Sequence, residues 1–139
     1  MLTHLHIANY ALIDRLDLDL RAGFSVITGE TGAGKSIILG ALGLLQGNRA
    51  EAKVIKDGAA KCVVEGEFAD FAPTLVDTLQ AADIDVEEDS IIVRREIMAG
   101  GKSRTFINDT PATLALLKEV SAQLIDIHSQ HQNLLLTRE

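Results

Sequence analysis

The sequence predicts an α/β fold built by a single chain of 139 residues. Apolar and polar residues alternate over residues 2–7 and 14–20, which is typical of strands with one buried face. Residues 24–28 form a short, β-branched apolar run that predicts a buried strand. A glycine-rich run and a helical pattern over residues 35–45 follow it directly. With 47% hydrophobic and 24% charged residues, the chain can bury a core.

The middle of the chain continues to alternate between helical and extended patterns. Gly47 and Asn48 are expected to end the helix over residues 35–45. Residues 62–68 predict a strand, in which Gly66 is expected to form a bulge. Pro73 lies where a helix can begin, and apolar residues recur after it at helical spacing.

The last third of the chain predicts a hairpin, a helix and a short strand. Residues 90–97 and 103–107 flank a glycine-containing loop, as in a β-hairpin. Thr110 is expected to cap a helix that has Pro111 at its first position. Residues 123–128 contain a short apolar strand, and the chain then stops without a cap.

Composition limits the classes of protein to consider. A single cysteine, Cys62, excludes an internal disulfide and is typical of a reducing compartment. The N-terminus has no signal-peptide pattern, and the longest apolar run, residues 37–45, is too short to span a membrane. We therefore expect a cytoplasmic protein with no membrane partner. A net charge of -7 and 4% aromatic residues argue against a general nucleic-acid-coating surface.

The strongest functional signal is a motif between the predicted buried strand and the helix after it. It matches the pattern G-x-x-x-x-G-K-[ST] of a phosphate-binding P-loop. The glycines let successive backbone N–H groups point at phosphate oxygens, and the helix N-terminus adds to that field. We expect the lysine to reach the β- and γ-phosphates of ATP and the serine to ligate Mg²⁺. The predicted nucleotide-binding residues are Gly29, Glu30, Thr31, Gly32, Ala33, Gly34, Lys35 and Ser36.

A second set of catalytic groups is missing from the sequence. P-loop hydrolases need a carboxylate that holds Mg²⁺ and another group that positions the attacking water. The usual source is an apolar strand ending in Asp-Glu, and no such strand occurs here. Asp126, after Leu124 and Ile125, comes nearest to that pattern. The chain is therefore either an incomplete catalytic unit or a self-contained small NTPase or kinase that uses Asp126.

Several segments, taken in order, resemble the RecN family, bacterial double-strand-break repair ATPases related to SMC proteins. They are residues 5–13, 27–36, 41–50, 103–109, 111–114 and 124–132. The resemblance covers essentially the whole chain. It implies an ABC-type ATPase head lobe with a mixed β-sheet and an antiparallel β-subdomain. In this family a long coiled coil splits the head, so residues 1–139 would be the N-terminal lobe. The C-terminal lobe would supply the signature motif and the Asp-Glu strand.

The resemblance also implies roles for individual residues and partners. Gln130 corresponds to the Q-loop glutamine, which contacts Mg²⁺ and the attacking water, although Gln132 lies close enough to take that role. Together with Lys35 it would form the catalytic set of this lobe. Arg49 and Lys56 are candidates for neutralising phosphate charge, or are surface residues. The implied partners are DNA, the protein's own C-terminal lobe and a second head in a homodimer. A different function for the chain, as the cytosolic ATPase of a membrane transporter, is the alternative.

Other features allow both a functional and a structural interpretation. Positive charge gathers on one predicted hairpin, which would either contact DNA phosphates or be a solvated surface. That basic group consists of Arg94, Arg95, Lys102 and Arg104. A metal site would use Asp126, His128 and His131, but their spacing is loose. His4 and His6 are expected at the surface, and Tyr10 is expected to pack or to stack on adenine.

Overall fold

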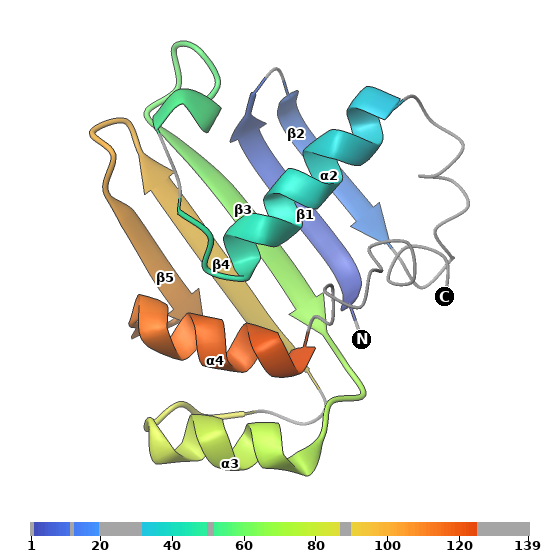
Figure 1. The fold of residues 1–139 in the computed structure, drawn as a ribbon, viewed down its shortest axis with the longest axis vertical. Coiled ribbons are helices and arrows are strands. Elements are labelled where there is room, and N and C mark those ends of the chain that lie inside the picture. The colour runs from blue at the N-terminus through green and yellow to red at the C-terminus, as the bar shows by residue number, and fades with distance from the viewer. Residues whose placement is uncertain (1, 12, 20–31, 50–51, 87–89, 125–139) are drawn as a thin grey trace.

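The computed structural model describes residues 2–11, 13–19, 32–49, 52–86 and 90–124, with side chains given from Ile37 onward in the first of its helices. Strands and helices alternate as the sequence predicts (Figure 1). In chain order they are β1 (Leu2–Tyr10), β2 (Ile13–Asp19), α2 (Gly32–Leu45), the 3-10 turn η2 (Ala52–Val54), β3 (Lys61–Phe68), α3 (Pro73–Ala81), β4 (Ile91–Met98), β5 (Ser103–Ile107), β6 (Thr110–Ala112) and α4 (Leu114–Leu124).

The described strands form one sheet in the order β2-β1-β3-β4-β5-β6. Each neighbouring pair within it is antiparallel. This sheet corresponds to the antiparallel subdomain that the family resemblance implies. The predicted strand over residues 24–28, which would make the sheet mixed, lies outside the described residues, and so does most of the strand predicted over residues 123–128.

Helices α2 and α4 lie across the same face of the sheet, and α3 packs beside α4 (Figure 1). Strand residues that point to that face are fully buried, among them Leu5, Ile7, Val64 and Ile97. The residues on either side of Leu5, Ile7 and Val64 along β1 and β3 are partly exposed, as period-two alternation requires. The core therefore lies between the sheet and α2 and α4, and α2 is one of its walls.

Gly66 does not form a bulge, so that prediction is wrong. Its pairing with Leu5 on β1 and Val93 on β4 continues without a shift, and the irregularity in register falls between Leu2 and His4 instead. A Cβ atom added at Gly66 would lie 2.9 Å from Leu45 Cδ1. The glycine is therefore explained by the close approach of α2 to β3, a packing constraint that the sequence pattern does not reveal.

The start of α4 also differs from the prediction. Thr110 and Pro111 belong to β6, where Pro111 pairs with Phe106 on β5. A proline fits here because β6 is the last strand of the described sheet, where a missing N–H costs little. Thr113 caps the helix instead, since its hydroxyl accepts a hydrogen bond from the Leu116 N–H at 3.1 Å. At the other end α4 runs through Leu124, so the strand predicted from residue 123 does not begin there.

Candidate functional site

The predicted phosphate-binding motif and the start of α2 overlap. The helix begins at Gly32, three residues earlier than the sequence pattern suggests, so that the backbone of residues 32–36 forms its first turn and a little more. The first N–H groups of a helix have no partner within the helix and carry its partial positive charge. The first turn contains no acidic residue that would oppose an anion there. Gly29, Glu30 and Thr31 lie outside the described residues.

The body of α2 is fixed by its apolar face. Ile38, Ala41, Leu42 and Leu45 are buried at the i, i+3, i+4 and i+7 positions of one helical stripe. On the neighbouring side of the helix, a Cβ atom at Gly40 would collide with the hydroxyl of Tyr10. That contact supports the packing interpretation of Tyr10.

The C-terminus of α2 ends as predicted. Gly47 has a positive φ of 93°. The Asn48 N–H donates to the Gly43 carbonyl and the Gly47 N–H to the Leu44 carbonyl, at 3.0 and 3.1 Å. This pair of bonds is a Schellman motif, the common glycine-dependent end of an α-helix. Gly47 also lies against the aliphatic stem of Lys118 on α4.

Arg95 completes this end of α2 from the sheet. It lies on β4 with only 2% of its surface exposed. Its Nη1 donates to the Leu44 carbonyl at 3.0 Å and to the carbonyl of Asn48. Burial lowers the pKa of Arg95 from its ordinary value, yet a guanidinium remains cationic at neutral pH. A cation therefore faces the negative end of the helix whose other end is the candidate phosphate site.

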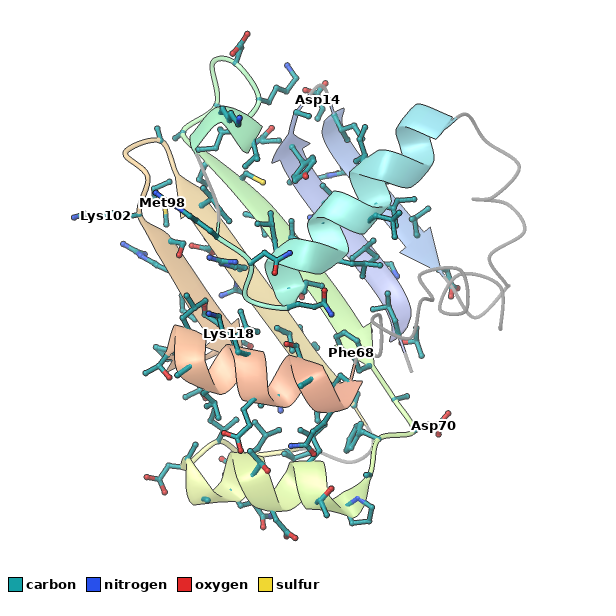
Figure 2. All side chains as sticks on the ribbon, in the orientation of Figure 1. Asp14, Phe68, Asp70, Met98, Lys102 and Lys118 are labelled. Atoms are coloured by element: carbon teal, nitrogen blue, oxygen red, sulfur yellow. The ribbon has the colours of Figure 1, made fainter. Side chains whose placement is uncertain are left out.

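The basic hairpin predicted from the sequence is not a single patch, because Arg95 faces the core. Arg94 lies on the opposite face of β4, stacks 4.5 Å from the Phe106 ring and pairs with Glu96 and Asp109, each at 3.4 Å. Lys102 and Arg104 are the exposed members of the group, and Lys102 projects from the tip of the β4–β5 hairpin (Figure 2).

The alternation along β4 indicates the burial of Arg95. Val93, Arg95 and Ile97 alternate along a strand, and the two apolar residues point inward. An arginine at the middle position of such a pattern must be buried on the same face. Its partner on α2 could not be identified from the pattern.

His4 and His6 lie on the face of β1 that α2 does not cover, as expected of surface residues. Both contact the same carboxylate oxygen of Asp17 on β2, His6 Nδ1 at 2.7 Å and His4 Nε2 at 3.4 Å. The hydrogen bond from His6 lowers the pKa of Asp17. Within the described ranges no three His, Cys, Asp or Glu residues are grouped in a way that could hold a metal ion.

Several predicted site residues cannot be placed. Gln130, Gln132, Asp126, His128 and His131 lie outside the described residues. The side chains of Lys35 and Ser36 also lie outside the description, although their backbone is in the first turns of α2.

The two residues considered for phosphate neutralisation have different surroundings. Arg49 is exposed, directly after the Schellman motif of α2. Lys56 pairs with Asp14 at 3.2 Å, near the turn between β1 and β2. Their roles stay predictions. No helix in the described part of the chain is long and apolar enough to cross a membrane.

Comparison with known proteins extends these observations. A family model described as an AAA domain matches residues 4–134. The chain is 40% identical over 140 residues to the DNA repair protein RecN of Bacillus subtilis, covering 100% of this chain and 24% of that protein. It is 42% identical over 131 residues to RecN of Vibrio cholerae, covering 94% of this chain and 24% of that protein. The chain thus spans about a quarter of the length of these curated relatives.

A solved structure shows the same fold. It comes from work on the ATP-driven dimerisation and DNA-stimulated activation of SMC ATPases, and it superposes with a TM-score of 0.65 at 19% sequence identity. The match covers 88% of this chain and 78% of that one. The fold predicted from the sequence, an ABC-type P-loop ATPase head lobe, is therefore confirmed.

Proposed function

The chain belongs to the AAA domain family, and from that premise we propose that it is the N-terminal, ATP-binding lobe of a RecN-type ATPase. Such a protein would act in DNA double-strand-break repair and recombination, in the cytoplasm where the bacterial chromosome lies. The observation that carries the proposal is the start of α2 at Gly32, inside the motif from Gly29 to Ser36. A P-loop needs its last glycines and its lysine in the first turn of a helix, and this chain has them there.

The residues of this motif fit ATP and Mg²⁺. Backbone N–H groups at the start of α2 would hold phosphate oxygens, and no acidic side chain of the first turn opposes them. Lys35 would neutralise charge on the β- and γ-phosphates, and the Ser36 hydroxyl would contribute one oxygen ligand to Mg²⁺. Gln130 would contact the same ion and orient the attacking water. When bound, Mg²⁺ would offset the negative charge that develops on the phosphates.

Full hydrolysis would depend on groups outside this lobe. The relatives are about four times longer than the matched segment, which leaves room for a coiled coil and a second lobe. We propose that the second lobe supplies the signature motif and the Asp-Glu strand, and that two heads dimerise around the nucleotides. DNA would be a partner of the complete protein. A self-contained NTPase or kinase that uses Asp126 is not favoured, because the chain matches RecN proteins along its whole length.

Replacing the P-loop lysine tests nucleotide binding directly. Lys35→Ala removes a charge-assisted contact worth roughly 1.5–3 kcal/mol, so we expect MgATP to bind at least about tenfold more weakly. Isothermal titration calorimetry measures the difference. Lys102→Ala is the matched control, since Lys102 is exposed on the distant hairpin and should leave the affinity unchanged. Equal affinity of Lys35→Ala and the unsubstituted chain would contradict the assignment.

The exposed tip of the β4–β5 hairpin is the part of the predicted basic group that could contact DNA phosphates. If it does, duplex affinity falls steeply with salt, by about 0.9 log units per log unit of salt for each contact. Lys102→Glu and Arg104→Glu are each expected to flatten that slope by about one contact. Fluorescence anisotropy with a labelled duplex at several salt concentrations gives the slopes. Lys118→Glu on α4 is the control of equal charge change.

The outcome distinguishes two locations for DNA binding. If the salt dependence of DNA affinity becomes less steep in the two hairpin variants and not in Lys118→Glu, the result supports DNA binding by the hairpin. Equal effects of all three reversals would show that only net charge matters. Absence of binding by the chain even at low salt would place the DNA contact in the other parts of the complete protein.

A further inference from the structure

Arg95 does more than fill the core between β4 and α2. We propose that it is a positioning residue for the nucleotide site, because it holds the C-terminus of the helix whose N-terminus forms that site. The inference rests on the proposed function of α2 as the P-loop helix. The residue touches no nucleotide in this arrangement and would act entirely through the placement of α2.

Burying the guanidinium of Arg95 costs desolvation free energy, which packing alone does not offset. It stands between Val93 and Ile97 on the inward face of β4, where both neighbours are apolar and buried. Its Nε is buried and has no hydrogen-bond partner among the described residues. A buried cation with an unsatisfied N–H commonly makes the folded protein less stable than an apolar residue of similar volume would. The residue must therefore provide something that an apolar side chain cannot.

What it provides is a polar link between the sheet and one end of α2. The Leu44 and Asn48 carbonyls, which accept from Nη1, lie on either side of Gly47, the glycine of the Schellman motif that follows the helix. Apolar contacts along α2 hold it against the sheet, and they have no preferred direction of their own. Two directional hydrogen bonds at the helix end fix the axial position as well as the tilt.

The link reaches the nucleotide site through the rigidity of the helix. The 14 residues of α2 make a rod about 20 Å long, so a shift at one end moves the other. Arg95 lies at the opposite end of α2, about 20 Å from the phosphate site, so its direct Coulomb interaction with bound phosphate is weak. The expected effect is therefore geometric, and phosphate-binding N–H groups are sensitive to displacements of less than about 1 Å.

Variants at Arg95 separate this role from plain stability. Arg95→Met keeps the length of the side chain and removes both hydrogen bonds, and Arg95→Lys keeps one donor and the charge. Ile97→Ala is the control, because it destabilises the same strand from the next inward position and removes no hydrogen bond to the end of α2. For each variant, urea unfolding measures stability and calorimetry measures the Kd for MgATP under conditions in which the chain is folded.

We expect Arg95→Met to weaken MgATP binding about tenfold, Arg95→Lys to restore part of the loss, and Ile97→Ala to bind as the unsubstituted chain does. We also expect Arg95→Met to shift the backbone amide NMR signals of residues 32–36 without nucleotide present. If Arg95→Met does not fold, the comparison is made between Arg95→Lys and Ile97→Ala. Weaker MgATP binding and shifted amide signals in Arg95→Lys, and in neither respect in Ile97→Ala, would then support the positioning role.

Two results would count against this inference, and they differ. Unchanged Kd values and amide signals in the folded Arg95 variants would overturn the positioning role and leave the proposed function intact. Absence of MgATP binding by the unsubstituted chain would contradict the proposed function and with it this inference.

Discussion

Restoring a second lobe to this chain is expected to raise steady-state ATP turnover by a factor of about 10³ or more. Alone, the chain offers a P-loop with Lys35 and Ser36, and Gln130 downstream of it. We propose that these groups hold MgATP. They include neither the carboxylate that polarises the attacking water nor the donors that a signature motif places opposite the γ-phosphate. Preorganised groups of that kind usually supply the largest single part of the rate enhancement.

The measurement compares phosphate release by two proteins under the same conditions. One is the 139-residue chain, and the other joins it to the C-terminal lobe through a shortened coiled coil. Similar ATP affinity with very different turnover is the expected result. Robust turnover by the chain alone, abolished by Asp126→Ala, would show instead that the chain is a self-contained NTPase.

Leu42→Ala is expected to lower the free energy of unfolding by about 2–5 kcal/mol. Leu42 is fully buried on the stripe of α2 that packs on the sheet, and its side chain is 0% exposed. Truncation removes apolar contacts and leaves a cavity that the rigid sheet cannot collapse to fill. Since marginal domains have only about 5–15 kcal/mol of stability, this loss is a large fraction of the total.

Urea denaturation followed by circular dichroism gives the change in unfolding free energy. Leu114→Ala provides the matched control, because Leu114 at the start of α4 is 39% exposed and its truncation should cost less than about 0.5 kcal/mol. Equal costs for the two substitutions would show that α2 is not a wall of the core, and the position of the P-loop helix would then need another explanation.

Local patterns in the sequence correctly predicted most of the fold. The strand alternation of β1 and β2, the Pro73 start of α3 and the β4–β5 hairpin depend on neighbouring residues, and all five elements are present. The end of α2 at Gly47 was predicted for the same reason, since backbone conformation and hydrogen bonding within a few residues decide it. The phosphate-binding role of the residues at the other end of α2 stays a prediction.

The errors occurred where one element meets another. The pattern of β3 predicts a bulge at Gly66, whereas the close approach of Leu45 from α2 leaves little room there for a larger residue. Thr110 and Pro111 were assigned to a helix cap because their local chemistry suits one. In the structure these two residues pair with β5 instead, and α4 begins later, with Thr113 as its cap.

The sequence by itself determined the motif, the order of elements and the family resemblance, since each is written in residues adjacent along the chain. Only the tertiary structure determined which basic side chains of the β4–β5 hairpin are exposed. Arg94, Arg95, Lys102 and Arg104 are close in sequence, yet the pleat of β4 sends Arg94 and Arg95 to opposite faces. Only the packing of α2 across that strand gives Arg95 its two carbonyl partners, 51 and 47 residues away in the chain. A charge that sequence reasoning assigned to the surface thereby became part of the support of the nucleotide site.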